Sequence, residues 1–170
     1  PWLGKPELFL ECSGKNTAKK DCIKFLKNKT KTVIISATSW DAEKTLIYGF
    51  NHQEFKKKIK IISYGSCTVN AFIPLGSFME NNYGIIDADV NVVHNIQEYR
   101  LKDNITLNRK FCTLEKSGPQ LLKSINKKNF KVNYTVVPYT GVSMIDFRFR
   151  LKKCPSINKL INTLEKETKD

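Results

Sequence analysis

The sequence lacks the features that mark membrane, secreted and zinc-binding proteins. No run approaches the roughly 20 apolar residues that a membrane-spanning helix needs, and no charged region followed by an apolar stretch marks a signal peptide. The five cysteines are an odd number at irregular spacings and form no Cys-x-x-Cys pair, which argues against a zinc site or a disulfide framework. We therefore expect a cytoplasmic protein with no bound metal and no membrane partner.

Acidic residues are scarce relative to basic ones. The chain has 29 Lys and Arg against 16 Asp and Glu, which gives a formal net charge of +13. Most of the excess is lysine scattered along the sequence, without the interleaved aromatic residues of a groove for single-stranded nucleic acid. A solvated surface is the default interpretation, and an anionic metabolite or nucleic acid stays open as a partner.

The first third of the chain predicts a parallel α/β unit. A short buried strand at Glu7–Cys12 precedes a helix over 17–28, which Asn16 or Thr17 can cap. The near-continuous apolar run at 32–37 is typical of a strand that is covered on both faces. Further short strands over 45–51 and 59–64 complete the end of a doubly wound parallel sheet.

The remainder predicts a mixed or antiparallel sheet with helices packed on it. From Ile85 the apolar residues alternate, with Ile86, Ala88, Val90 and Val92 on one side, and Tyr134–Leu151 forms a second alternating segment. Helical spacing predicts helices over 67–82, 114–125 and 156–166, the last of them closing the domain against the sheet.

Cys67 lies where a predicted strand meets a predicted helix. The first turn of a helix carries N–H groups without intrahelical partners and the positive end of the helix dipole, which favour a thiolate. The helix from Cys67 to about Asn82 rises roughly 22 Å, and the strand from Ile86 to His94 returns roughly 26 Å. An antiparallel return would lay the imidazole of His94 beside the sulfur, a recognised nucleophile and base pair. The alternatives are an inert thiol and a core histidine.

Five motifs, in one order, extend a family resemblance over residues 10 to 146. Ser66-Cys67-Thr68-Val69-Asn70, with His94 following, resembles the Ser-Cys-Thr-Thr-Asn motif and the later catalytic histidine of phosphorylating glyceraldehyde-3-phosphate dehydrogenases. The other matches are Leu10-Glu11-Cys12-Ser13-Gly14, Val33-Ile34-Ile35-Ser36-Ala37, Gly49-Phe50-Asn51-His52 and Val137-Pro138 with Val142-Ser143-Met144-Ile145-Asp146.

The resemblance implies a domain division and an enzymatic role. It makes residues 1–65 the C-terminal part of a dinucleotide-binding domain and residues 66–170 a catalytic domain of a homotetrameric enzyme. It implies that Cys67 attacks a small phosphorylated aldehyde, that His94 takes the proton, and that NAD or NADP accepts hydride before inorganic phosphate cleaves the thioester. It assigns the cofactor to Ser13, Gly14 and Ser36, and phosphate groups to Ser66, Thr68, Ser117 and Gly118.

The sequence also departs from the family pattern. It contains no Gly-x-Gly-x-x-Gly motif, so we expect a fragment of a longer protein that is inactive alone. The family's arginine before Val-Pro falls at Val136, and its threonine after the histidine falls at Gln97, which leaves Arg109, Arg148 or Arg150 as substitutes. The alternatives are a dehydrogenase for another aldehyde, such as erythrose 4-phosphate, and a non-catalytic module that binds nucleic acid or protein.

Overall fold

A computed structural model describes residues 4–103 and 105–168. The chain divides into two compact units, one made of Pro1–Leu75 with Phe111–Leu121 and the other of Gly76–Lys110 with Leu122–Asp170. The division into domains at residue 65 stays a prediction. Within the described ranges, no helix has the length and apolar character needed to cross a membrane.

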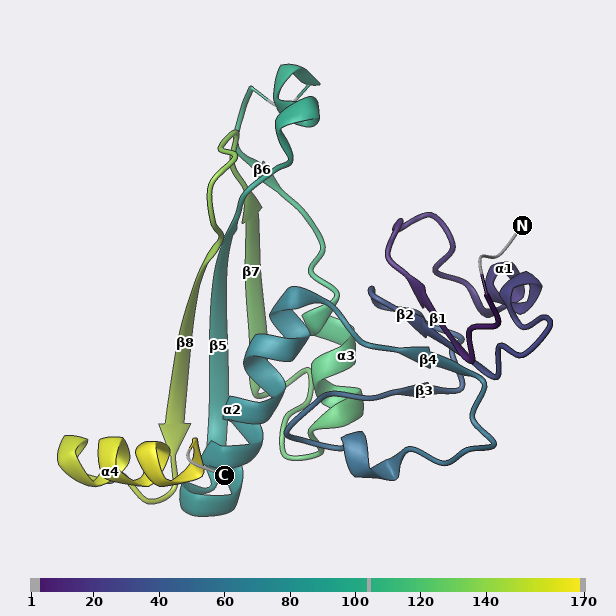
Figure 1. Cartoon of the computed structure of the whole chain (residues 1–170). Coiled ribbons are helices and arrows are strands. Elements are labelled where there is room, and N and C mark those ends of the chain that lie inside the picture. The colour runs from purple at the N-terminus through teal and green to yellow at the C-terminus, as the bar shows by residue number, and fades with distance from the viewer. Residues whose placement is uncertain (1–3, 104, 169–170) are drawn as a thin grey trace. The chain divides into compact units, whose positions relative to one another are not determined.

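The first unit contains the predicted parallel sheet (Figure 1). Its strand order is β1-β2-β4-β3, in which β1 is Leu8–Glu11, β2 is Thr32–Ile35, β4 is Ile61–Ser63 and β3 is Lys44–Thr45. In the register Glu11 lies opposite Ile35, and Ile35 lies opposite Ser63. The strands β1, β2 and β4 therefore end at one edge of the sheet, where ligands bind in folds of this kind.

The helix between β1 and β2 is shorter than predicted. It consists of α1 (Lys19–Cys22) and one turn of 3-10 helix, η1 (Ile23–Phe25), rather than a helix over 17–28. Asn16 does not cap it, because its side-chain amide donates to Glu11 and its oxygen accepts from Lys24. Cys22 is fully buried and packs with Val33, Ile35 and Ile61 in the core between this helix and the sheet.

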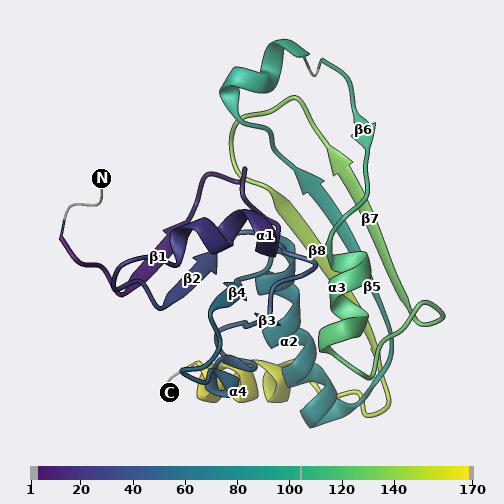
Figure 2. The same cartoon turned by 90° about the vertical axis from the view of Figure 1, so that its right-hand side faces the viewer.

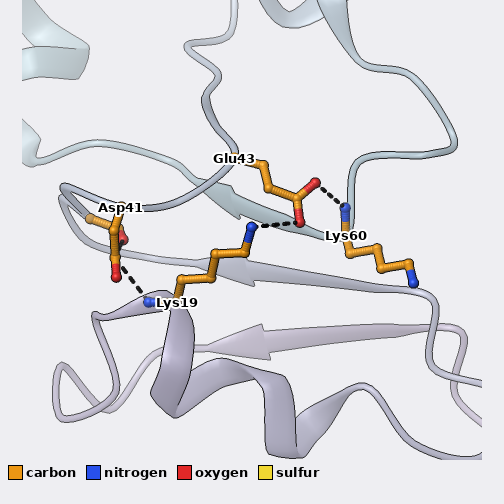
Figure 3. A network of polar contacts seen from close by, with 5 residues as sticks. Lys19, Asp41, Glu43 and Lys60 are labelled. Carbon is orange, nitrogen blue, oxygen red and sulfur yellow. Dashed lines mark hydrogen bonds and ion pairs between the residues drawn. The ribbon is translucent and has the colours of Figure 1, made fainter.

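A network of polar contacts attaches α1 to the loop after β2 (Figure 3). The backbone N–H of Lys19 donates to Asp41 over 2.9 Å, and its ammonium lies 3.5 Å from Glu43. The other oxygen of Glu43 accepts from the backbone N–H of Lys60 over 3.1 Å. The hydrogen bond from Lys19 is the main cause of a lowered pKa for Asp41.

The strand predicted over 45–51 is limited to the two residues of β3. The chain then turns, because the side chain of Asn51 accepts from the N–H of Ile47 over 2.7 Å and donates to the carbonyl of Thr45 over 3.0 Å. Gly49 adopts a positive φ of 78° in this turn. A 3-10 helix, η2 (His52–Glu54), follows.

One face of the parallel sheet is only partly covered within the described part of the chain. The run at 32–37 had predicted a strand covered on both faces, and on this face Ile34 packs against the buried residues Leu46, Ile59 and Ile62 but also lines an apolar groove of about 320 Å³. Leu8, Tyr48, Phe55 and Tyr64 also line it and are between 43% and 72% exposed. Burial of Val33 and Ile35 on the other face is nearly complete.

The second unit contains the predicted mixed sheet (Figure 2). Its strand order is β6-β7-β5-β8, in which β6 is Asn108–Arg109, β7 is Phe130–Val136, β5 is Ile85–His94 and β8 is Met144–Leu151. β5 runs parallel to β7 and antiparallel to β8. The predicted segment Tyr134–Leu151 is thus two strands on either side of β5, separated by a loop with Pro138 and Gly141.

The predicted alternation of buried and exposed residues along β5 holds except at the start of the strand. Ala88, Val90 and Val92 are buried as predicted, whereas Ile86 is 40% exposed. The pairing with β8 shifts register between Ile85 and Asp87, and such a bulge inserts one residue and reverses the faces before it. Ile85 is buried in place of Ile86.

The helices follow the predicted order. α2 is Cys67–Tyr83, the 3-10 helix η3 is Glu98–Asp103, α3 is Leu114–Leu121 and α4 is Ile157–Glu167. Ser156 caps α4 by accepting from the N–H of Lys159 over 3.4 Å. The prediction that this last helix packs on the sheet is only weakly met, because it contains no fully buried residue and Ile157 is 76% exposed.

Candidate active site

The turn from β4 into α2 requires a glycine. Gly65 is buried and has a φ of +75°, a conformation that other residues adopt only at a cost. A Cβ atom there would lie 3.0 Å from Cδ1 of Ile47 and 3.2 Å from Cγ1 of Val69. The hydroxyl of Ser63 fixes the turn, since it accepts from the N–H groups of Gly65 and Ser39 and donates to the carbonyl of Ala37.

Ser66 caps the helix that begins at Cys67. Its hydroxyl accepts from the N–H of Val69 over 3.3 Å, and its carbonyl accepts from the N–H of Asn70 over 2.9 Å. The side chain of Asn70 donates to the carbonyls of Tyr64 and Ser66 and closes the turn from the other side. Cys67 is exposed at the first position of α2, where the helix dipole stabilises negative charge.

A cluster of hydroxyl groups flanks Cys67. The hydroxyls of Ser66 and Thr68 lie 3.0 Å apart, and the hydroxyl of Thr113 donates to that of Ser66 over 2.8 Å. Thr68 also lies 3.5 Å from the sulfur of Cys112. Thr113 and Cys112 were not predicted as site residues, because no local pattern reveals a contact across more than 40 residues. Burial raises the pKa of the Cys112 thiol, which keeps it protonated at neutral pH.

The residues predicted to bind the cofactor lie at the carboxyl edge of the parallel sheet. Ser13 and Gly14 follow β1, and Ser36 follows β2, with all three exposed. The hydroxyl and N–H of Ser13 both donate to the buried carboxylate of Glu11, which also accepts from Asn16. Burial opposes ionisation of Glu11, but these hydrogen bonds outweigh it and lower the pKa of Glu11 below its ordinary value.

The two phosphate-binding residues predicted on α3 lie inside that helix. Ser117 and Gly118 are buried, and the N–H of Ser117 donates to the carbonyl of Thr113 over 3.0 Å. Their predicted role in binding phosphate stays a prediction. Thr113, which directly precedes α3, is the residue of this segment that contacts Ser66.

His94 is the last residue of β5, in the second unit. Its Nδ1 lies 2.6 Å from the carbonyl oxygen of Asn95, and its ring lies 5.4 Å from the ring of Tyr134. A carbonyl oxygen only accepts hydrogen bonds, so Nδ1 is the donor in this contact, which orients the imidazole ring.

Asn95 attaches the end of β5 to the loop that precedes β8. Its N–H donates to the hydroxyl of Ser143 over 3.2 Å, and that hydroxyl donates to the side-chain oxygen of Asn95 over 3.0 Å. The side-chain amide of Asn95 donates to the carbonyl of Gly141 over 2.6 Å. The backbone that accepts the proton of the His94 ring is therefore held in place by three hydrogen bonds.

A cavity of about 500 Å³ opens beside His94, within the second unit. The residues that line it are His94, Asn95, Ile96, Gln97, Arg100, Lys110, Tyr134 and Val136. They include two cationic side chains and, among these described residues, no acidic one. Cys67 belongs to the other compact unit, and its pairing with His94 stays a prediction.

Curated proteins similar to this chain are glyceraldehyde-3-phosphate dehydrogenases. A cytosolic one from Arabidopsis thaliana is 27% identical over 183 aligned positions, covering 99% of this chain and 54% of that protein. A cytosolic one from Oryza sativa subsp. japonica is 28% identical and covers 98% of this chain and 53% of that protein. A muscle one from Jaculus orientalis is 38% identical over 90 positions, 53% of this chain and 24% of that protein. No family model matches.

The α/β fold and these relatives together support the family resemblance seen in the sequence. The chain is similar to glyceraldehyde-3-phosphate dehydrogenases over nearly its whole length, which confirms that resemblance at low identity. It spans about half the length of the curated relatives it matches.

Gly65→Ala tests the strand-to-helix turn. Both Gly65→Ala and the control Gly49→Ala place a side chain at positive φ, which costs about 1–2 kcal/mol. Only Gly65→Ala also forces a Cβ against Ile47 and Val69, so we expect it to lose about 1–3 kcal/mol more. Urea unfolding measures both free energies, and equal losses would contradict a packing constraint at Gly65.

Glu11→Gln tests the carboxylate that holds the loop after β1. We expect a loss of about 1–3 kcal/mol in the free energy of unfolding at neutral pH, because Ser13 and Asn16 lose a charged acceptor on a buried side chain. The lowered pKa of Glu11 means that its contribution is present above the unfolded-state pKa and is lost as pH falls through the folded-state pKa.

Unfolding curves across the acid range should therefore show the difference between wild type and Glu11→Gln shrinking as pH falls. Glu7→Gln is the matched control, because the carboxylate of Glu7 is exposed and pairs with the exposed ammonium of Lys31. A pH-independent difference for Glu11→Gln would show that the ionised carboxylate contributes nothing.

Proposed function

We propose that the protein to which this chain belongs oxidises a small phosphorylated aldehyde, such as glyceraldehyde 3-phosphate, to an acyl phosphate. The observation that carries the proposal is the exposed Cys67 thiol at the first residue of α2, flanked by hydroxyl groups. A thiolate at a helix N-terminus is a good nucleophile, and an aldehyde is the electrophile that the family acts on.

In the proposed reaction Cys67 and His94 share the work of nucleophile and base. The thiolate adds to the aldehyde carbon, and the N–H groups at the start of α2 stabilise the oxyanion, which takes a proton from water to give the thiohemiacetal. The hydroxyl proton of the thiohemiacetal passes to Nε2 of His94 as hydride departs, which leaves a thioester. An oxygen of inorganic phosphate then attacks the thioester carbon, releases the acyl phosphate and restores the thiolate.

The lengths of α2 and β5 support the pairing of these two side chains. From Cys67 to Tyr83 the helix of 17 residues rises about 24 Å, and the ten-residue strand that ends at His94 spans about 30 Å. These lengths are comparable and only Gly84 separates the two elements, which is the basis on which we propose the pairing.

NAD or NADP would accept the hydride when bound, and the chain offers part of a site for it. Ser13, Gly14 and Ser36 lie exposed at one edge of the parallel sheet, and no heavy atom lies within 4 Å of the position of a Cβ at Gly14. That open backbone at the carboxyl end of β1 allows close approach of a dinucleotide. We propose these residues as one wall of the cofactor site.

The attacking phosphate has a proposed place beside the nucleophile. The hydroxyls of Ser66, Thr68 and Thr113 are joined by hydrogen bonds next to the N-terminus of α2, an arrangement that suits an anion. Ser117 and Gly118 belong to the same proposal through the helix that Thr113 precedes. Two of the named relatives are cytosolic, and we propose the same compartment and a homotetrameric protein.

The competing function is a lysine-rich module that binds nucleic acid or protein without catalysis. The net charge of +13 is its only support. In such a module Cys67 and His94 would have no chemical coupling, so the reactivity of the thiol separates the two functions.

Alkylation by iodoacetamide tests the coupling of Cys67 to His94. We expect Cys67 to react fastest of the five cysteines at neutral pH, and His94→Asn to slow it by about tenfold or more, since the base that activates it is lost. Buried Cys22 and Cys112, with raised pKa values, should react slowly. Peptide mass spectrometry measures each site.

His52→Asn is the matched control, because His52 lies on η2, and its Nδ1 accepts from the N–H of Gly49 over 3.0 Å. Exposed Cys12 and Cys154 report the reactivity of cysteines outside the site. Equal rates at Cys67, Cys12 and Cys154, unaltered by His94→Asn, would favour the binding module.

Aldehyde-dependent reduction of NAD or NADP by the full-length protein tests the reaction itself. We expect turnover with glyceraldehyde 3-phosphate and inorganic phosphate, its loss in Cys67→Ser, and a decrease of about 10²–10⁴-fold in kcat for His94→Asn. Erythrose 4-phosphate assayed in parallel identifies the aldehyde. Undiminished turnover in Cys67→Ser would overturn the proposed mechanism.

A further inference from the structure

The cavity beside His94 brings together two cations from distant parts of the second unit. Arg100 lies on η3, six residues after the histidine, and Lys110 follows the short strand β6. The backbone N–H of Lys110 donates to the carbonyl of Tyr134 over 3.0 Å, and Tyr134 also lines the cavity. This hydrogen bond holds the backbone of Lys110 against β7, next to the cavity that Lys110 lines.

The neighbouring cations are placed elsewhere. Arg109 lies in β6, where it pairs with Thr135 of β7, and it does not line the cavity. This is expected, because the side chains of successive residues in a strand point to opposite faces of the sheet and Lys110 is the next residue. Arg148 and Arg150 are bound to the carboxylates of Asp146 and Asp87. The substitutes expected from the sequence therefore do not line the cavity, whereas Arg100 and Lys110 do.

The rest of the lining suits a small anion with a polar tail. Asn95 and Gln97 supply amide groups, Tyr134 and Val136 form a partly apolar wall, and no described lining residue is acidic. Glu98 and Asp103 share the helix η3 with Arg100, but neither of them lines the cavity. Arg100 and Lys110 both line the cavity, and guanidinium and ammonium groups are the usual means of binding a phosphoryl group.

Resting on the function proposed above, we propose that Arg100 and Lys110 bind the phosphoryl group of the aldehyde substrate in this cavity. The valine at position 136, at the end of β7, carries no charge. Arg100 on η3 and Lys110 at the end of β6 would supply the positive charge instead. The cavity volume of about 500 Å³ leaves room for a phosphate monoester beside the imidazole of His94.

Binding of glycerol 3-phosphate to the chain tests this assignment without any catalytic step. The probe is titrated while the ring signals of His94 are followed by NMR, with inorganic phosphate and glycerol in parallel. We expect saturable binding of glycerol 3-phosphate, weaker binding of inorganic phosphate and none of glycerol. Arg100→Gln and Lys110→Gln should each weaken binding by about tenfold, the scale of one charge-assisted hydrogen bond.

Arg109→Gln removes the same charge from a neighbouring position outside the cavity and should change the affinity less than about twofold. Lys110→Arg should preserve binding, and circular dichroism checks that each variant is folded. Absence of saturable binding, equal weakening by Arg109→Gln, or a preference for inorganic phosphate over glycerol 3-phosphate would each overturn the assignment.

The outcome is separable from that of the proposed function. Cys67→Ser should leave binding of glycerol 3-phosphate unchanged, and Arg100→Gln should leave alkylation of Cys67 unchanged. A chain that binds the monoester but shows no activated thiol would refute the proposed chemistry and not the anion site, and the reverse result would refute the anion site alone.

Discussion

The hydroxyl of Ser63 is the contact on which the position of Cys67, the proposed nucleophile, depends. It makes three hydrogen bonds, to the backbone of Ala37, Ser39 and Gly65, and so joins the ends of β2 and β4. The chain can then turn sharply at Gly65 and start a helix whose first residue is Cys67. A buried hydroxyl with all its bonding capacity used is a stiff support, and a stiff support is what a nucleophile at a strand end requires.

Much of the fold could be predicted because local pattern and tertiary environment agree. The run around Ile35 and the alternation around Val90 each satisfy one periodicity, and both became strands. The errors occurred where a side chain bonded to the backbone or to a neighbouring element, or where the strand pairing shifted by one residue. Asn16 contacts Glu11 instead of capping α1, Asn51 folds back to end β3, and a bulge reverses Ile86.

Only some residues of the candidate site could be predicted from the sequence. Cys67 and His94 could be named because an order of motifs marks them. Thr113, Arg100 and Lys110 could not, because each reaches its neighbours through loops whose path no periodicity encodes. Val136 stands where the family has an arginine. The sequence shows that this arginine is missing but does not indicate which cation could replace it.

Ser143 supports the backbone that contacts the ring of His94, because it is hydrogen-bonded to Asn95. Ser143 is 48 positions away from Asn95 along the chain, yet its hydroxyl both receives from and gives to that asparagine. These two hydrogen bonds hold Asn95, whose carbonyl accepts from Nδ1 of His94. A serine in a distant loop thereby supports the contact that orients the imidazole ring.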